Sequence, residues 1–477
     1  MHTITSRRYF MIRAGAYAAG FAGLRAAYAS VRTDCDLLSR PGPGYGPLVR
    51  DPERVIDLPE GFTYAIFSRT GEIMDDGLRV PGAHDGMAAF PGPDGLTILV
   101  RNHELDLTQS HLGPFGKDMP LPRDIPPSRV FDRGARIENP PAGIEAPNRA
   151  VPSPGGTTTL VYDTRPARAG EPGRLVSHSL SLVGTERNCA GGPTPRNTWI
   201  SCEESVVKAR AGRARDHGYC FEVPATTQIG LVEPVPLREM GRFNHEACAT
   251  DPATGIVYMT EDRSDGLIYR YLPKDRDDLA RGGELQAAVV KDRPGLDTRS
   301  WKERSIEPGA RVALEWTTMK EVGSPADDLR MRGFEQGAAR FARGEGMWYG
   351  KGAIYFVCTN GGAARKGQVW KLTPSAAGGS LELFIECTHP GPMENPDNIT
   401  VSPWGDLVLC EDESSVNTDG VQRLYGVTPA GDVYILARNR MNRSEFAGAT
   451  FSPDGTTLFV NIQRPGLTLA IHGPWRR

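Results

Sequence analysis

One cysteine and two neighbouring glutamates are the residues in this sequence best suited to chemistry. Cys189 lies in the small-residue segment 188–192, which is typical of a turn, and Glu203 and Glu204 follow a short apolar run that predicts a strand. Side chains alternate along a strand, so one of the two carboxylates can face an interior site. A thiolate beside carboxylates suits a metal such as iron. The same residues are equally compatible with a buried structural cysteine and two solvated acids.

Acidic residues recur at the ends of other predicted strands. Arg343 stands two residues before one of them, where it could bind an anionic substrate through two N–H groups or balance the neighbouring acids. His103 and His245, each next to an acid, are expected to orient ligands by hydrogen bonds rather than to bind metal. The acids in this pattern are Glu104, Glu203, Glu204, Glu246, Asp262, Glu345, Asp397, Glu411 and Asp412.

The elements that carry these acids are short strands in a repeated hairpin. Residues 249–262, 400–412 and 450–461 each show a strand, a turn with proline and glycine, a second strand and a polar end. Almost no helical periodicity is present beyond the amino terminus. Repeated strand hairpins predict a β-propeller, here of five to seven blades, because each sheet needs neighbours to bury its faces. In a propeller the strand ends that carry the acids would converge on the central channel.

Such a gathering of carboxylates requires cations. Without them, like charges packed near one axis would raise the pKa values of the carboxylates or unfold the site. Calcium binds several carboxylate oxygens at once, so the pattern predicts a metal centre at one end of the channel.

Two stretches interrupt the strand pattern. Residues 105–150 are rich in proline, glycine and charge and are predicted to form long loops. Residues 273–310 are predicted to form a mixed helix-and-loop insertion. Loops of this length on a rigid scaffold either cover a site or decorate the surface, and the sequence leaves both open.

Residues 1–29 are predicted to be a twin-arginine export signal. Arg7 and Arg8 stand in Ser-Arg-Arg-Tyr-Phe, a weakly apolar stretch covers 14–24, and Ala27-Tyr28-Ala29 fits the small-x-small cleavage rule. We therefore expect a mature chain from about Ser30, exported folded by the twin-arginine machinery to the periplasm or the medium. No other stretch is long and apolar enough to span a bilayer, so stable membrane insertion is not expected.

Charge and cysteine content argue against several classes of function. The net charge of −3 gives no basic patch for nucleic acid or membrane lipid. The eight cysteines include Cys35, and none forms a CxxC pair, so a zinc ribbon or redox motif is not indicated. Several lie within apolar runs, as packed thiols do. An oxidising compartment would permit disulfides, but the spacing does not show which pairs form.

Taken together, these motifs resemble the PhoX-type alkaline phosphatases. The resemblance spans nearly the whole mature chain and is carried by segments 6–10, 188–192, 201–204, 241–246, 260–262 and 396–398. It implies a six-bladed propeller over residues 30–477. It also implies two iron ions, as Fe(III), bridged by a thiolate and an oxo group, with Ca²⁺ beside them. In that picture Cys189 is the bridging thiolate and Arg343 binds phosphate, and the metal ligands are Glu203, Glu204, Glu246, Asp262, Glu345, Asp397 and Glu411.

We therefore expect an exported metalloenzyme that hydrolyses small-molecule phosphomonoesters. The sequence contains no Gly-x-Ser-x-Gly elbow, which disfavours a serine hydrolase. One rival is a calcium-dependent propeller lactonase or esterase, which needs carboxylates but no thiolate. The other is a non-catalytic metal-binding propeller. Arg196-Asn197 stands where the family usually has Trp-Gly.

Overall fold

The computed structural model describes residues 42–116, 121–136, 150–166, 172–376, 378–388, 391–412 and 420–476. The chain divides into one unit from Met1 to Pro47 and another from Leu48 to Arg477. All described strands belong to the second unit. The predicted export signal at 1–29 and Cys35 lie outside the described residues.

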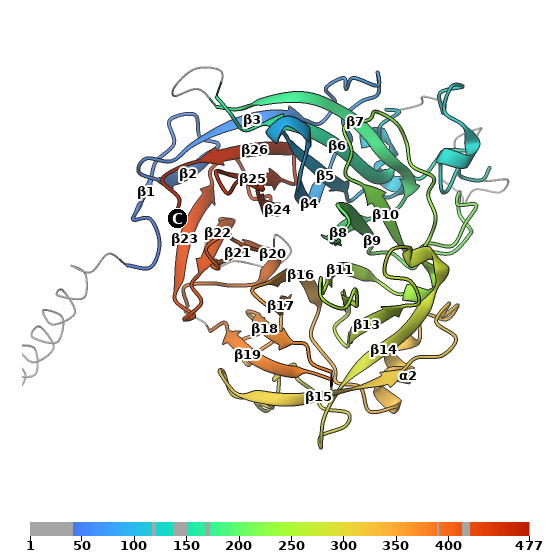
Figure 1. The fold of residues 1–477 in the computed structure, drawn as a ribbon, viewed down its shortest axis with the longest axis vertical. Coiled ribbons are helices and arrows are strands. Elements are labelled where there is room, and N and C mark those ends of the chain that lie inside the picture. Colours follow the sequence, from blue (N-terminus) through green and yellow to red (C-terminus); the bar gives the residue numbers. More distant parts are fainter. Residues whose placement is uncertain are drawn as a thin grey trace, which may run out of the picture. The chain divides into compact units, whose positions relative to one another are not determined.

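The unit from Leu48 onward is an all-β propeller, as the sequence predicts (Figure 1). Its antiparallel strands form five sheets, and the nine-stranded sheet consists of two blades joined by a shared strand, which gives six blades. Blade 1 is β4 (His84–Pro91), β5 (Thr97–His103), β6 (Gly155–Asp163) and β7 (Arg174–Thr185). Blade 2 is β8 (Asn188–Pro193), β9 (Thr198–Glu203) and β10 (Cys220–Pro224). Blade 3 is β11 (His245–Thr250), β12 (Val257–Glu261), β13 (Ile268–Pro273) and β14 (Gly283–Val290).

The remaining blades follow the same antiparallel order. Blade 4 is β16 (Gly344–Gly350), β17 (Ala353–Cys358), β18 (Gln368–Thr373) and β19 (Ser380–Glu386). Blade 5 is β20 (Pro396–Val401), β21 (Leu407–Glu411), β22 (Arg423–Val427) and β23 (Val433–Asn439), extended by β2 (Ile56–Pro59) and β1 (Leu48–Val49). Blade 6 is β24 (Phe446–Phe451), β25 (Thr457–Ile462), β26 (Leu467–His472) and β3 (Thr63–Arg69). The additional strand β15 (Arg311–Thr318) pairs with both β14 and β19 and so joins blades 3 and 4.

The first strand of each blade forms an inner ring. β4 contacts β8, and the contacts continue through β11, β16, β20 and β24 back to β4. The ring is also closed by the chain itself, because β3, from the start of the unit, pairs with β26 near its end. A closed ring buries both faces of every sheet except at the outer edge, which fixes the inner strands rigidly.

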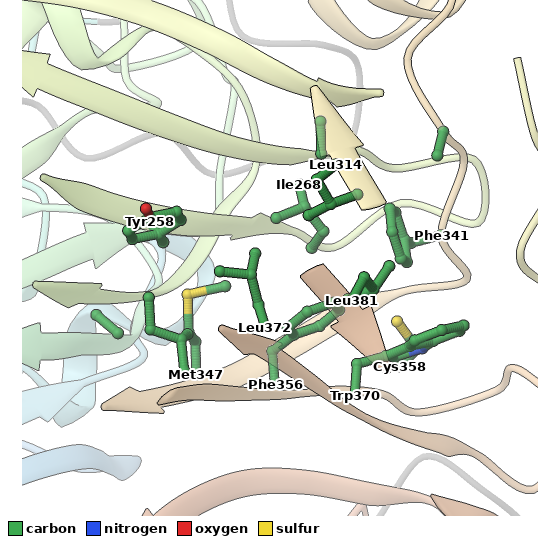
Figure 2. Packing of buried hydrophobic residues seen from close by; sticks show 14 of the residues in the cluster. Tyr258, Ile268, Leu314, Phe341, Met347, Phe356, Cys358, Trp370, Leu372 and Leu381 are labelled. Carbon is green, nitrogen blue, oxygen red and sulfur yellow. The ribbon is translucent and has the colours of Figure 1, made fainter. Parts of the chain in front are cut away.

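Apolar side chains from neighbouring blades fill the space between the sheets. Figure 2 shows the cluster between blades 3 and 4, in which Tyr258 and Ile268 of blade 3 pack with Phe356 and Trp370 of blade 4. Leu314 of the joining strand β15 belongs to the same cluster. These contacts hold the ends of β11 and β16 in place.

The three predicted repeat copies are hairpins of the inner ring. Residues 249–262, 400–412 and 450–461 correspond to the turns and strands of β11–β12, β20–β21 and β24–β25. The prediction of a turn at 188–192 was wrong, because these residues form the inner strand β8. The glycines serve close packing instead. A Cβ on Gly191 would lie 2.0 Å from the Ile200 carbonyl oxygen, and one on Gly192 would lie 2.0 Å from that of Cys248.

The two interruptions differ from the expectation in part. Within 273–310 the structure has a 3-10 turn at Leu279–Arg281 and the strand β14, and no described α-helix lies there. Within 105–150 the described parts hold short 3-10 helices at Leu107–Leu112 and Pro127–Arg129 between loops. Elsewhere the structure has α2 (Leu329–Glu335) and 3-10 turns at Pro93–Gly95 and Arg238–Met240. None of the described helices has the length and apolar character needed to cross a membrane.

Candidate metal centre

The second residue of the inner strand carries a possible metal ligand in five blades. The first residue of the strand pairs with the end of the second strand, and the register then shifts, so the second residue lies in a bulge. A bulge redirects a side chain out of the regular alternation, here toward the channel. The residues at this position are Asp85, Cys189, Glu246, Glu345 and Asp397. In blade 6 it is occupied by Ala447, and Glu445 stands just before the strand.

A second layer of polar residues follows the second strand of each blade. In all six blades the backbone N–H of the residue that follows the second strand donates to the backbone carbonyl of the residue that precedes the inner strand. In blade 2, for example, the Glu204 N–H donates to the Arg187 carbonyl over 2.8 Å. This repeated bond makes the six positions equivalent around the ring. The N–H donors are Glu104, Glu204, Asp262, Thr359, Asp412 and Gln463, and the carbonyl acceptors are Ala83, Arg187, Asn244, Arg343, Asn395 and Glu445.

Among the described residues, side chains of the two layers, together with Glu445, form four groups of ligand atoms. Within each group the ligand atoms lie within 4.8 Å of one another, and neighbouring groups share Cys189, Glu246 or Asp397. The groups are Asp85–Glu104–Cys189, Cys189–Glu204–Glu246, Glu246–Glu345–Asp397 and Asp397–Asp412–Glu445. A pocket of about 360 Å³ opens over them, lined by Glu104, Arg187, Cys189, Glu204, Asp262, Arg343, Glu345, Asp397, Asp412, Glu445, Gln463 and Arg464.

Glu246 stands at the junction of two of these groups. Its side chain is fully buried, at 0% exposure, and neither carboxylate oxygen has a hydrogen-bond partner among the described residues. Burial raises the pKa of Glu246 well above its usual value, and Glu204 and Asp397 raise it further. A buried charge is tolerated when it is paired or coordinates a metal. The residues present therefore fit a cation held by Glu246.

The pKa values of other ligand residues are raised for the same reason. Burial raises the pKa of the Cys189 thiol, with a further contribution from Asp85. It also raises the pKa of Glu345, beside Asp262, and the pKa of Asp397 to about 8, beside Asp412. Multivalent cations would reverse each of these shifts, because a bound cation favours the deprotonated ligand.

Arg343 lies among three carboxylates at the pocket wall. Its Nε donates to Asp262 Oδ1 over 2.9 Å, its Nη1 to Asp412 Oδ2 over 3.0 Å and its Nη2 to Glu345 Oε1 over 2.5 Å. The guanidinium is thus held by blades 3, 4 and 5 at once. It both balances the acids and presents N–H groups at the pocket.

Comparison with known proteins identifies the family. The sequence model of the family described as alkaline phosphatase PhoX matches residues 43–466. The chain belongs to this family. It is accordingly an enzyme, and its reaction is that of a phosphatase. No curated protein matches the sequence.

Solved structures support the fold. PhoX of Pseudomonas fluorescens in complex with vanadate, a transition state analogue, has a TM-score of 0.65 at 17% identity, over 91% of this chain and 98% of that one. At this identity the likeness shows the propeller fold. Two further similar structures have a TM-score of 0.35. A putative gluconolactonase is 12% identical over 90% of this chain and 99% of its own. A gluconolactonase of Xanthomonas campestris is 11% identical over 91% and 99%.

The structure brings together most of the residues that the resemblance to PhoX implies. Cys189, Glu204, Glu246, Glu345 and Asp397 all belong to the ligand groups. Asp262 lines the pocket beside Arg343.

Glu203 and Glu411 are not brought to the ligand groups. Glu203 points into the blade, where His217 Nδ1 donates to it over 2.6 Å and the Gly218 N–H over 2.8 Å. Glu411 accepts from the Tyr425 hydroxyl over 3.0 Å. Each is the last residue of its strand, and the next residue, Glu204 or Asp412, faces the pocket instead. Strand alternation requires this opposition.

Four ligand-group residues are absent from the ligand set that the resemblance implies. Glu104 and Asp412 belong to the acidic pattern, whereas Asp85 and Glu445 belong to neither set. The sequence does contain a pattern that indicates Asp85. In blades 1 to 4, the possible ligand that lies in the bulge is followed each time by glycine or alanine. A Cβ on Gly86 would lie 2.5 Å from the Ala190 Cα, so the small residue allows adjacent inner strands to approach.

The two histidines beside the acids are hydrogen-bonded within the blades. His103 Nδ1 lies 2.9 Å from the Gly82 carbonyl oxygen and its Nε2 lies 2.9 Å from Thr158 Oγ1. His245 Nε2 donates to the Gly241 carbonyl oxygen over 3.0 Å. Both therefore orient the strand ends that carry Glu104 and Glu246, as the sequence predicts.

Proposed function

We propose that this PhoX family phosphatase is an exported enzyme that hydrolyses small-molecule phosphomonoesters with iron and calcium at the candidate centre. The observation that carries the proposal is Glu246, a buried carboxylate that has no hydrogen-bond partner in the described part of the chain and is shared by two ligand groups. Such a residue fits a ligand between neighbouring cations. The mildly acidic chain would require this neutralisation before an anionic phosphate ester could approach.

The ligand groups divide by chemistry. Two groups contain the Cys189 thiol, and thiolate with carboxylate oxygens suits iron. The other two contain carboxylates alone, which suits calcium. Cys189 is shared by its two groups, in keeping with the bridging thiolate that the family resemblance implies. A calcium-dependent lactonase would need no thiol at this place, so the position of Cys189 favours the phosphatase.

The chain's own residues prepare the pocket for a phosphoryl group. When bound, the cations would supply attraction for the phosphoryl oxygens and for the charge that develops on them. Arg343 would then direct its N–H groups to the same oxygens, because its carboxylate partners would bind the cations. Glu203, held by His217, would keep the end of β9 and thereby Glu204 in place.

The role of Arg343 provides the test. Arg343→Lys should retain its metals but lose about ten- to a thousandfold in turnover of p-nitrophenyl phosphate, because an ammonium cannot donate two parallel N–H bonds. Arg343→Ala should lose at least as much. Metal content and hydrolysis are to be measured on the same samples. Unchanged hydrolysis in Arg343→Ala would remove this residue from the site, and absence of hydrolysis in the metal-loaded parent protein would refute the function.

The proposal of export is based on the predicted signal at residues 1–29. Twin-arginine export carries folded proteins, so the centre could be loaded with metal before the chain leaves the cytoplasm. This order would suit a site whose ligands come from every blade and are complete only after the ring has closed.

A further inference from the structure

The pocket contains a second arginine placed like Arg343. We propose that Arg187 is a second phosphate-binding residue, and that the two guanidinium groups make the site selective for phosphomonoesters over phosphodiesters. This inference rests on the proposed function.

The backbone around the two arginines is the same. Each stands directly before an inner strand, and each carbonyl accepts the repeated bond, from Glu204 N–H over 2.8 Å for Arg187 and from Thr359 N–H over 3.0 Å for Arg343. Both residues have positive φ, 48° and 49°, which is uncommon for arginine. Equal backbone conformation at equivalent ring positions directs the two side chains in the same way relative to their blades.

The amide bonds of the arginines to the preceding blade are also equivalent. The Arg187 N–H donates to the carbonyl of Leu105, and the Arg343 N–H donates to the carbonyl of Arg263, each over 2.9 Å. Leu105 and Arg263 directly follow Glu104 and Asp262, so both contacts fall at the same place in the preceding blade.

The side chains repeat this equivalence. Arg187 Nε donates to Glu104 Oε1 over 3.1 Å, as Arg343 Nε donates to Asp262 Oδ1 over 2.9 Å. The carboxylate is in each case the second-layer residue of the preceding blade. Arg187 Nη2 reaches Glu104 over 2.8 Å and also bonds Glu204. Its side chain is 42% exposed and that of Arg343 is 29% exposed, so both remain accessible from the pocket.

The two arginines flank the blade that carries Glu246. Arg187 precedes Cys189 by two residues in blade 2, Arg343 precedes Glu345 by two residues in blade 4, and Glu246 of blade 3 is grouped with both ligands. An anion at cations held by Glu246 would therefore have a guanidinium on either side. The other four equivalent positions hold Ala83, Asn244, Asn395 and Glu445. Arg464 also lines the pocket but follows Gln463, outside this position.

Two guanidinium groups and a cation cluster suit a phosphoryl group with three terminal oxygens. A phosphomonoester offers three and carries up to two negative charges, whereas a diester offers two and carries one. A bound diester would offer no terminal oxygen to the N–H groups of one arginine. A site built to bond three terminal oxygens therefore favours the monoester.

The competing account makes Arg187 a counter-charge for Glu104 and Glu204. In that case its removal would weaken metal binding or folding, and any fall in activity would be equal for both substrate classes.

The test compares Arg187→Gln and Arg187→Lys with the parent holoenzyme. Hydrolysis of p-nitrophenyl phosphate and of methyl p-nitrophenyl phosphate is measured with the same leaving group, together with iron and calcium content. Binding of inorganic phosphate and of dimethyl phosphate is measured by calorimetry. Arg311→Gln is the matched control, since Arg311 pairs with Glu382 over 2.7 Å on an exposed strand outside the pocket.

We expect Arg187→Gln to lower kcat/KM for the monoester by about ten- to a hundredfold, the scale of a lost bond to a charged group. The diester rate should stay within about twofold, phosphate binding should weaken while dimethyl phosphate binding does not, and metal content should be retained. An equal fall for both substrates, an unchanged monoester rate, or loss of metal in both variants would overturn the proposal. If the parent hydrolyses neither substrate, the proposed function fails, and phosphate binding then decides the role of Arg187 by itself.

Discussion

At the scale of single residues, the centre is defined by charges that the protein alone does not neutralise. Within the part of the chain that the structure describes, the buried Glu246 has no hydrogen-bond partner, and its neighbours Cys189, Glu345 and Asp397 all have raised pKa values. Arg187 and Arg343 balance part of the negative charge from the pocket wall. The remainder of the charge makes the site dependent on cations, which leads to two predictions.

Cys189→Ser should abolish iron binding and leave a folded propeller. A serine hydroxyl stays protonated and is a poor ligand for iron, while its smaller size disturbs packing little. Elemental analysis measures the iron and circular dichroism the fold. Cys358→Ser is the comparison, because Cys358 is buried and belongs to no ligand group among the described residues. Full iron occupancy in Cys189→Ser would contradict the assignment.

The metal-free protein should lose stability between about pH 7 and pH 8.5. Burial raises the folded-state pKa of Asp397 to about 8, far above its unfolded value near 4, and the pKa values of Glu246 and Glu345 shift in the same direction. The folded state then keeps protons that the unfolded state has released. The stabilisation is complete below the unfolded pKa and is lost as pH rises through the folded one.

Titration of buried histidines has the opposite effect on stability, but it lies below this pH window. Burial lowers the pKa values of His84, His103 and His178, which stabilises the folded state as pH rises to about 6.5. Thermal unfolding of chelated protein at the two pH values measures the difference, and Asp397→Asn should reduce it. A melting temperature that rises with pH across this window would refute the charge argument.

At the scale of elements, the bulge of the inner strand determines the centre. The bulge presents the ligand to the channel, and the small residue after it lets neighbouring strands approach. Gly346 shows the constraint, because a Cβ there would lie 2.6 Å from the Asp397 carbonyl oxygen and 2.8 Å from the Asn398 Cα.

Gly346→Ala should therefore displace β20 and with it Asp397. We expect a loss of about 1–3 kcal/mol in the free energy of unfolding and a reduced calcium content. Chemical denaturation and elemental analysis provide the measurements. Gly323→Ala is the control, since nothing lies within 4 Å of a Cβ at that position. Equal stability and metal content in the two variants would show that the close approach of the strands is unimportant.

The same elements show what the sequence could and could not predict. The repeated hairpins predicted the propeller, and the acids at their ends include six of the ligand-group residues. The resemblance to PhoX implied Cys189 as well. The bulge was not predictable from strand periodicity, since it depends on pairing with a distant strand, and the segment 188–192 was therefore mistaken for a turn. For the same reason alternation showed that one of Glu203 and Glu204 faces the site but not which one. Asp85 was missed because its ligand neighbour Cys189 is remote in sequence.

At the scale of the whole molecule, the centre exists only when the ring is complete. The ligand groups draw residues from all six blades, and blade 6 needs β3 from the start of the unit to pair with β26 at its end. Folding and ring closure are thus required before the ligand groups are complete.

Changing Arg7 and Arg8 together to lysine should retain the protein in the cytoplasm. The predicted signal contains this pair as part of an address that the export receptor would read, and lysine would not replace it. Cell fractionation measures the distribution, with activity of the retained protein showing that it has folded. Normal recovery outside the cytoplasm would contradict the predicted signal.

We propose that a thiolate–carboxylate centre holds iron and calcium for phosphatase chemistry. The test is elemental analysis of the parent protein, purified after its own export and assayed on p-nitrophenyl phosphate. We expect both metals in stoichiometric amounts, and loss of hydrolysis when chelators remove them. An active phosphatase that contains neither iron nor calcium would contradict it.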